Sequence, residues 1–271
     1  MKMKVETKRN FLYALSIVTG LIILQNIRFL IFGKFLFSVC TLGLLFIFMS
    51  EFITTYTRHK KILKEHSLTE FAEDIHKHHT FQYVYLTICL FVLNVLFIYY
   101  STILVINLMI IFISGFLFFN IFNEVKKTYL NDFIVSPNVA IIFDLTKSLI
   151  FFLATFVLTI RLINVENGYL YTALLLFIFH LFNVFFSSHH NVKLHALPIL
   201  AIFGSLLTVG LYILLMAGTR VYNIMTIAGM SSLMALVTTN IYHHEVEKSL
   251  NRDVIIEYLL ITIFVLILIL S

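Results

Sequence analysis

Three ionisable residues stand inside long apolar stretches of the sequence, where charge is costly. Asp144 and Lys147 are three positions apart, so on a helix they share one face and can neutralise each other. His180 lies in the next apolar stretch. Its distance from the end of that stretch is about the same as the distance of Lys147 from the start of the preceding stretch. An ionisable group inside a membrane helix costs about 2.5 to 3.5 kcal/mol, which makes it a functional candidate. We predict that Asp144, Lys147 and His180 meet in a catalytic polar pocket; the alternative is an ion pair and hydrogen bonds that only hold the helices together.

Further polar residues are spaced to surround this pocket. One carboxylate and two amides near the ends of other apolar stretches would line its mouth: Glu51, Asn120 and Asn183. The longest polar connection adds three carboxylates that can contact the head of a substrate: Glu70, Glu73 and Asp74. Together they form the predicted substrate-binding set.

Histidine is concentrated in the polar connections between the apolar stretches. Nearly all of the 11 histidines lie in three such connections, so imidazoles from distant parts of the chain can converge. Neutral imidazole is a common ligand of divalent metals. The predicted metal ligands are His189, His190, His195, His243 and His244. The alternative is that histidine, like Tyr and Lys, suits the head-group boundary of a membrane.

The elements that must position these residues are membrane helices. Hydrophobic residues make up 60% of the 271-residue chain and charged residues 12%, whereas about a quarter of a soluble domain is charged. This composition excludes a water-soluble globule, and basic residues dispersed in short runs indicate no nucleic-acid partner. The sequence therefore predicts an all-α polytopic transmembrane helix bundle, with residues 1–271 forming a single integral membrane domain of about nine spans. The expected spans are residues 11–27, 35–56, 81–99, 102–122, 138–160, 169–188, 196–217, 221–242 and 254–270.

The charges between the spans predict the orientation. Lys and Arg gather at the amino terminus and after the second, fourth, sixth and eighth spans. Because positive charge stays inside, we expect a multi-pass protein of the cell membrane with a cytoplasmic amino terminus and a carboxyl terminus outside. Residues 57–80 place apolar side chains at helical spacing among charges, which predicts a cytoplasmic amphipathic helix with a capping box at Ser67. Pro137 and Pro198 suit first helical turns and predict two helix starts.

Two expected helix ends are similar in sequence. Residues 120–127, Asn-Ile-Phe-Asn-Glu-Val-Lys-Lys, match residues 240–248, Asn-Ile-Tyr-His-His-Glu-Val-Glu-Lys, with one residue inserted. Hairpins that recur in this way would be parallel two-helix repeats. The alternative is that helix ends at a head-group boundary converge on Asn, aromatic residues and Lys.

The arrangement of about nine spans, with polar connections after the even-numbered ones, resembles the UbiA superfamily of intramembrane prenyltransferases. After the second span, Glu70, Glu73 and Asp74 stand where that family has its first Asp-rich motif, and after the sixth, residues 189–198 are similar to the segment before a conserved proline in the haem farnesyltransferase branch. Neither Asp-rich motif is intact. The resemblance implies a prenyl diphosphate substrate held through Mg²⁺ or another divalent metal.

Three functions stay open on these grounds. The first is transfer chemistry on a lipid or prenyl substrate at the cytoplasmic side, with membrane lipid as the partner. The second is a transporter, or a membrane subunit of a larger complex, with a polar path through Asp144, Lys147 and His180. The third is a sensor or immunity protein whose residues 57–80 contact a protein partner in the cytoplasm.

Overall fold

The described part of the chain is helical throughout. The computed structural model describes residues 2–30, 32–66, 70–125, 137–186, 198–217 and 223–246, with parts of 251–267, and no strand occurs among them. The helices are α1 (Lys2–Ile27), α2 (Gly33–His66), α3 (Glu70–Tyr100), α4 (Leu104–Asn120), the π-helix η1 (Ile121–Val125), α6 (Pro137–Leu162), α7 (Gly168–Phe186), α8 (Pro198–Ala217) and α9 (Ile224–Val246). The predicted all-α class is confirmed, and α6 and α8 begin at the two prolines.

Seven helical segments are long and apolar enough to cross a membrane. They are Thr7–Ile27, Gly33–Thr54, Tyr83–Tyr100, Leu104–Asn123, Ile141–Leu162, Ile199–Ala217 and Ile224–Tyr242, and each coincides with an expected span. The expected sixth span corresponds to a shorter apolar helix, Gly168–Val184. Most of the expected ninth, residues 254–270, lies outside the described residues. The structure thus supports a multi-pass membrane protein, and the count of nine stays a prediction.

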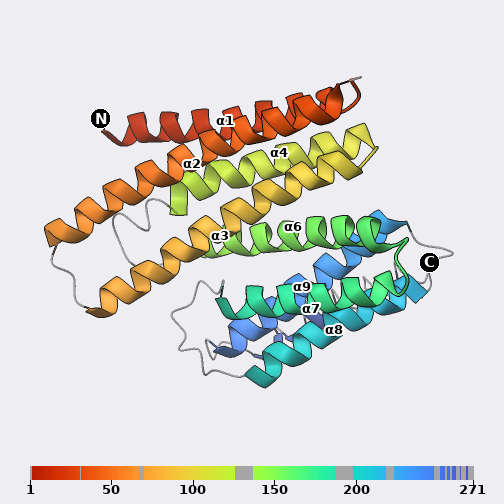
Figure 1. The fold of residues 1–271 in the computed structure, drawn as a ribbon. Helices are drawn as coiled ribbons and strands as arrows, with labels where there is room; N and C mark the ends of the chain where they lie inside the picture. The colour runs from red at the N-terminus through yellow and green to blue at the C-terminus, as the bar shows by residue number, and fades with distance from the viewer. Residues whose placement is uncertain are drawn as a thin grey trace. The chain divides into compact units, whose positions relative to one another are not determined.

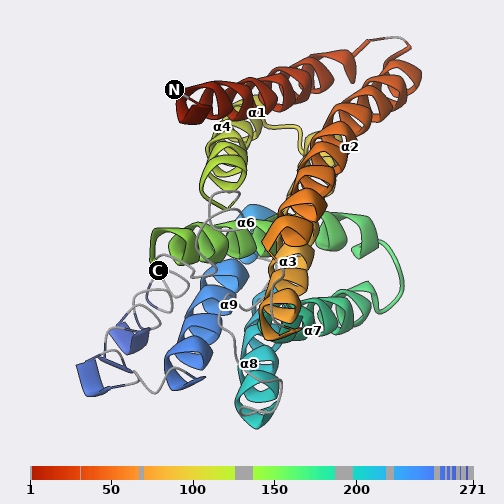
Figure 2. The same ribbon diagram turned by 90° about the vertical axis from the view of Figure 1, so that its left-hand side faces the viewer.

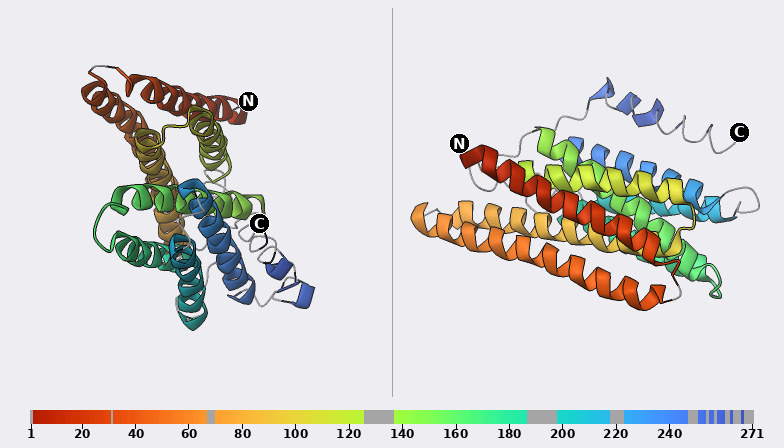
Figure 3. Two further views of the ribbon diagram at one scale, coloured as in Figure 1. Left: turned by 90° about the vertical axis from the view of Figure 1, so that its right-hand side faces the viewer. Right: turned by 90° about the horizontal axis from the view of Figure 1, so that it is seen from above.

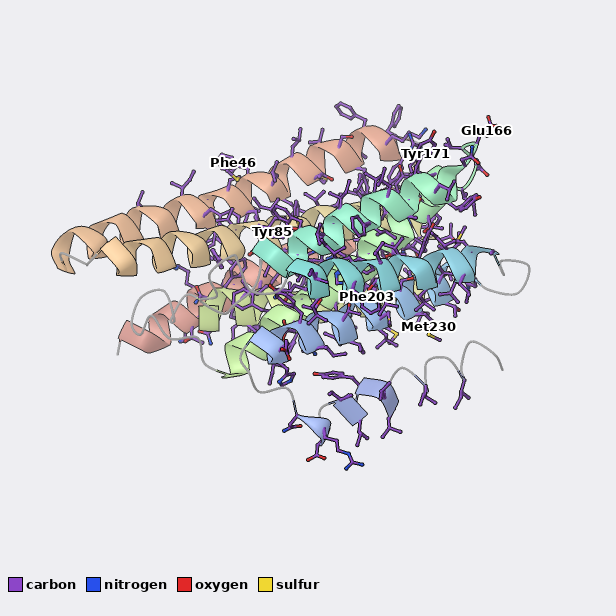
Figure 4. The ribbon with its side chains drawn as sticks, turned by 90° about the horizontal axis from the view of Figure 1, so that it is seen from below. Phe46, Tyr85, Glu166, Tyr171, Phe203 and Met230 are labelled. Carbon is purple, nitrogen blue, oxygen red and sulfur yellow. The ribbon has the colours of Figure 1, made fainter. Side chains whose placement is uncertain are left out.

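The outer surfaces of these helices are apolar, as a lipid environment requires. Phe46 on α2 is 77% exposed, and Phe203 on α8 and Tyr171 on α7 are also exposed (Figure 4). Large exposed apolar side chains recur along the helices. In water they would form patches far larger than soluble monomers tolerate, whereas in a bilayer they contact acyl chains.

The chain divides into two compact units, Met1–Thr146 and Lys147–Ser271, where the sequence predicts one membrane domain. The boundary falls inside α6, so no linker separates them. In the N-terminal unit, α1 lies beside α4 and α2 (Figure 1). In the C-terminal unit, α8 lies beside α7 and α9 (Figure 2).

Aromatic side chains join α2 and α3 as an antiparallel pair. Ring contacts occur in sequence from one end to the other, Phe37 with Tyr99, Phe48 with Phe91 and Phe52 with Tyr83, at centroid separations of 5.4, 5.2 and 5.5 Å. The two helices accordingly run side by side (Figure 3). Residues 57–66 continue α2 and residues 70–80 begin α3, so the predicted amphipathic segment 57–80 consists of the ends of two long helices, and residues 67–69, which include the predicted cap, lie outside the described part.

Glycine allows two of the short turns between helices. A Cβ atom on Gly33, at the start of α2, would lie 2.6 Å from the carbonyl oxygen of Ile27. A Cβ atom on Gly168, at the start of α7, would lie 1.7 Å from that of Leu162. Real Cβ atoms do not approach backbone oxygens so closely, so both hairpins need glycine at the start of their second helix. Glycine thus lets the chain turn back into the bilayer after a short connection.

Candidate functional site

His180 connects three helices of the C-terminal unit. It lies on α7, is 2% exposed, and its Nε2 is 3.0 Å from the Oγ1 of Thr238 on α9. The Thr238 hydroxyl is in turn 3.3 Å from that of Thr208 on α8. The ring of Phe151 on α6 packs edge to face against the imidazole, with 5.4 Å between the ring centroids. This side of the imidazole is therefore apolar.

The Thr238 hydroxyl contacts both His180 and the backbone of its own helix. The Thr238 hydroxyl donates to the carbonyl oxygen of Met234 at 3.0 Å, one turn back on its own helix. When this hydroxyl donates its single proton to Met234, it accepts from Nε2 of His180, which then carries the ring proton. When the hydroxyl proton turns to Nε2 instead, the ring proton is on Nδ1.

Lys147 and Asn183 lie at one level of the C-terminal unit, next to this histidine. Lys147 is 6% exposed and stands one turn before Phe151 on the same face of α6. Asn183 is 4% exposed and stands one turn after His180 on α7. The tight turn at Gly168 makes α6 and α7 antiparallel, so both residues are displaced in the same direction from the contact of Phe151 with His180. We call Lys147, His180, Asn183, Thr208 and Thr238 the C-terminal polar cluster.

Asp144, the third predicted catalytic residue, lies one turn before Lys147 on α6 and is half-buried. The pair therefore shares a helix face, as its spacing predicts. Lys147 is the more deeply buried of the two. Their catalytic role stays a prediction.

The other two predicted mouth residues, Glu51 and Asn120, belong to the N-terminal unit. Glu51 is buried on α2, next in sequence to Phe52, whose ring contacts Tyr83 of α3. The amide of Asn120 donates to the carbonyl oxygen of Phe116 at 2.8 Å, within its own helix. Their part in binding a substrate stays a prediction.

The remaining predicted ligands fall where the structure says little or nothing about side chains. The three carboxylates of the first turns of α3 have a described helical backbone only: Glu70, Glu73 and Asp74. His189, His190 and His195 lie outside the described residues, and His243 has a described backbone on α9. His244 is half-buried, with its ring 6.1 Å from that of Tyr258. Among described residues, no group of three or more His, Cys, Asp or Glu side chains can hold a metal ion.

Sequence reasoning missed Thr208 and Thr238. Both are β-branched residues in apolar helices, where a threonine hydroxyl usually bonds its own backbone. One signal was available: Gly204 on α8 lets α9 approach, since a Cβ atom there would lie 3.1 Å from the Cβ of Thr238. Small residues at helix interfaces, with Ser and Thr nearby, are typical of packed membrane helices.

Comparison of the chain with protein-family models, with curated proteins and with solved structures gave no match. The fold and the buried polar residues thus define its class alone: a helical bundle built of apolar, membrane-length helices with a polar cluster inside its C-terminal unit.

Proposed function

We propose that the chain is an integral membrane protein that binds the polar head of a lipid or prenyl substrate at the C-terminal polar cluster. One observation carries the proposal: Lys147, His180 and Asn183 are all nearly inaccessible to solvent within apolar helices. Lys147 lies on α6, which is long enough to cross a membrane, and the other two lie on the shorter apolar helix α7. Retaining a cation, an imidazole and an amide in such surroundings is costly. Binding of a substrate head group would explain why these polar residues are kept despite the unfavourable free energy of their burial.

The chemistry of the cluster favours an anionic head. Lys147 supplies a positive charge, and the amide of Asn183 supplies further N–H donors at the same level. Phosphate and diphosphate groups carry negative charge and several acceptor oxygens, which match such donors. The exposed apolar faces of α7 and α8 would contact the acyl or isoprenoid chain.

Mass spectrometry of lipid that co-purifies with the protein in a mild detergent tests this proposal. The variants are Lys147→Gln and His180→Gln, and the matched control is Lys34→Gln, which removes an exposed cation at the start of α2. We expect the amount of bound phosphorylated isoprenoid or phospholipid to fall by at least about tenfold in the two cluster variants and to stay constant in the control. A tenfold loss corresponds to about 1.4 kcal/mol of binding free energy. Equal lipid in all four proteins would refute the proposal.

Transfer of a prenyl group with Mg²⁺ or another divalent metal is the more specific form of this proposal. It rests on the resemblance to the UbiA superfamily and requires carboxylates and histidines at the cytoplasmic ends of the helices. Incubation with a prenyl diphosphate and a polyisoprenoid or aromatic acceptor, with and without Mg²⁺, tests it. Metal-dependent product would support the transferase; binding without turnover would leave only the lipid-binding function.

Transport of a solute or proton is a second candidate, favoured by polar contacts that recur along the C-terminal unit. Near the middle of α6, the hydroxyls of Ser148 and Ser232 are 2.9 Å apart. Farther along the same helix, Thr159 and Tyr212 are 3.3 Å apart. Together with the ionisable Lys147 and His180, these hydroxyls place polar groups at successive depths, as a conduction path requires. Flux into liposomes containing the protein, abolished by His180→Gln, would support transport over lipid chemistry.

A further inference from the structure

Arg28 occupies a fixed position at the end of the first span. It follows α1 directly, and its own N–H continues the helical bonding by donating to the carbonyl oxygen of Leu24 at 3.3 Å. The turn that follows is closed by the N–H of Gly33, which donates to Leu30 at 2.8 Å. Because this turn requires glycine, the backbone under Arg28 has little freedom.

Half of the Arg28 guanidinium has partners within the protein. Its Nη1 donates to the carbonyl oxygens of Ile98 and Ser101, at the end of α3. Carbonyls in the last turn of a helix lack partners in that helix and attract cations. These bonds hold the side chain across the mouth of the turn between α3 and α4.

The other half makes no hydrogen bond among the described residues, and the guanidinium carbon lies over the ring of Phe29, 4.5 Å from its centroid. Nε and Nη2 of Arg28 are both buried and make no hydrogen bond there. These two nitrogens form the side-on edge of the guanidinium, which pairs with two oxygens of one carboxylate or phosphate. Leaving buried, charged donors unmatched costs more than the usual penalty of about 1 to 3 kcal/mol for a neutral group. Burial also lowers the pKa of Arg28, although a guanidinium keeps its proton.

Three residues near Arg28 also have a buried polar atom without a hydrogen bond among the described residues. Asn107 donates both to the carbonyl oxygen of Ser101, at 3.2 Å, and to Oε1 of Gln25, at 2.8 Å. The carbonyl of Ser101 thus connects Asn107 with Arg28. Five of the ten buried side-chain atoms without a partner in the described chain belong to these four residues: Gln25 Nε2, Arg28 Nε, Arg28 Nη2, Ser101 Oγ and Asn107 Oδ1. We call Gln25, Arg28, Ser101 and Asn107 the Arg28 cluster.

We propose that the Arg28 cluster is a binding site for a phosphate group. Three of the five unmatched atoms are N–H donors, and a serine hydroxyl can also donate. A tetrahedral phosphate offers oxygens in several directions, so it would match the Arg28 edge, Gln25 and Ser101 once these side chains turn toward one position and make room for it. Asn107 Oδ1, the one atom that can only accept, suits a protonated phosphate oxygen or a bridging water.

Two sources of phosphate fit this position. The first span ends at Ile27, next to Arg28, so the site lies at the depth of phospholipid head groups. Inorganic phosphate from the aqueous side has the same chemistry. The site belongs to the N-terminal unit and is independent of the function proposed for the C-terminal polar cluster.

Thermal unfolding of the delipidated protein in detergent tests the proposal. The probes are phosphatidylglycerol, diacylglycerol with the same acyl chains and no phosphate, and inorganic phosphate. We expect phosphatidylglycerol or inorganic phosphate to raise the Tm by about 3 to 6 °C more than diacylglycerol does. Arg28→Lys, which keeps the charge and loses the two-nitrogen edge, should remove at least half of that shift. The control is Arg161→Lys at the end of α6, where the arginine is exposed.

A second variant keeps the test valid if Arg28→Lys fails to fold. Gln25→Glu retains the oxygen that accepts from Asn107 and gives Arg28 an internal anion. We expect a higher Tm without phosphate and no further shift on adding it. A shift with phosphatidylglycerol alone identifies a head-group site, and a shift with inorganic phosphate identifies a free-anion site. No shift with either probe, or an equal shift in wild type, Arg28→Lys and Gln25→Glu, overturns the proposal.

Discussion

The Nε2 atom of His180 lies 3.0 Å from the hydroxyl oxygen of Thr238, so α7 and α9 are joined by a side-chain hydrogen bond inside the C-terminal unit. The same hydroxyl lies 3.3 Å from that of Thr208, which brings α8 into the contact. A bond of this kind both stabilises the helix packing and orients the imidazole. Substitution can separate the contribution of this bond to stability from its contribution to function.

A double-mutant cycle on His180 and Thr238 should give a coupling free energy of about 0.6 to 1.7 kcal/mol, the range for hydrogen bonds between membrane helices. His180→Gln, Thr238→Val and the double variant would be compared by unfolding in mixed micelles. Thr54→Val serves as control, because the Thr54 hydroxyl is exposed and, among the described residues, donates to the carbonyl oxygen of Ser50 in its own helix. Additive effects at His180 and Thr238 would contradict the bond.

Gly204→Ala should destabilise the protein by about 1 kcal/mol or more, because the added methyl group must displace α9 from α8. Its Cβ would lie 3.1 Å from the Cβ of Thr238, closer than nearly all Cβ contacts. Gly210→Ala on the same helix is the matched control, since nothing lies within 4 Å of its Cβ position. There alanine should be neutral or stabilising, as it favours helix over glycine. The Tm values of the two variants measure the difference.

Phe48→Ala should cost about 3 to 5 kcal/mol of unfolding free energy, the range for removing a buried aromatic side chain. Phe48 is 1% exposed and its ring centroid lies 5.0, 5.2 and 5.8 Å from those of Phe52, Phe91 and Phe118. Phe46, two positions away on the outer face of α2, is the control (Figure 4). Phe46→Ala should change the free energy by less than about 0.5 kcal/mol. Similar losses in both variants would place Phe48 outside the core.

The predicted orientation is tested by reporter fusions. A reporter after Ser271 should be active outside the cell and one inserted near Lys64 inside it, because the basic residues gather on one side of the expected spans. The opposite result at either site would overturn the predicted topology of nine spans with the amino terminus inside. An inside location for both would indicate an even number of spans in place of nine.

The sequence alone determined the class of this protein and most of its helix positions. A run of about 20 apolar residues must become a helix in a bilayer, because no water satisfies its backbone. Eight of the expected spans therefore recur as helices, seven of them long enough to cross a membrane, and two begin at their prolines. The burial of Lys147 and His180 inside such helices was likewise predictable from their position in apolar runs.

Only the tertiary structure decided which polar groups meet. Thr208 and Thr238 look like ordinary residues of apolar helices, and Arg28 like a charge in a short turn; the hydroxyl contact at His180 and the unmatched atoms around Arg28 depend on helices distant in the chain. The physical reason is the difference between local and long-range interactions along the chain. The length and hydropathy of a helix are local properties of the chain, whereas hydrogen-bond partners depend on which faces pack together and how closely glycines such as Gly204 allow them to approach.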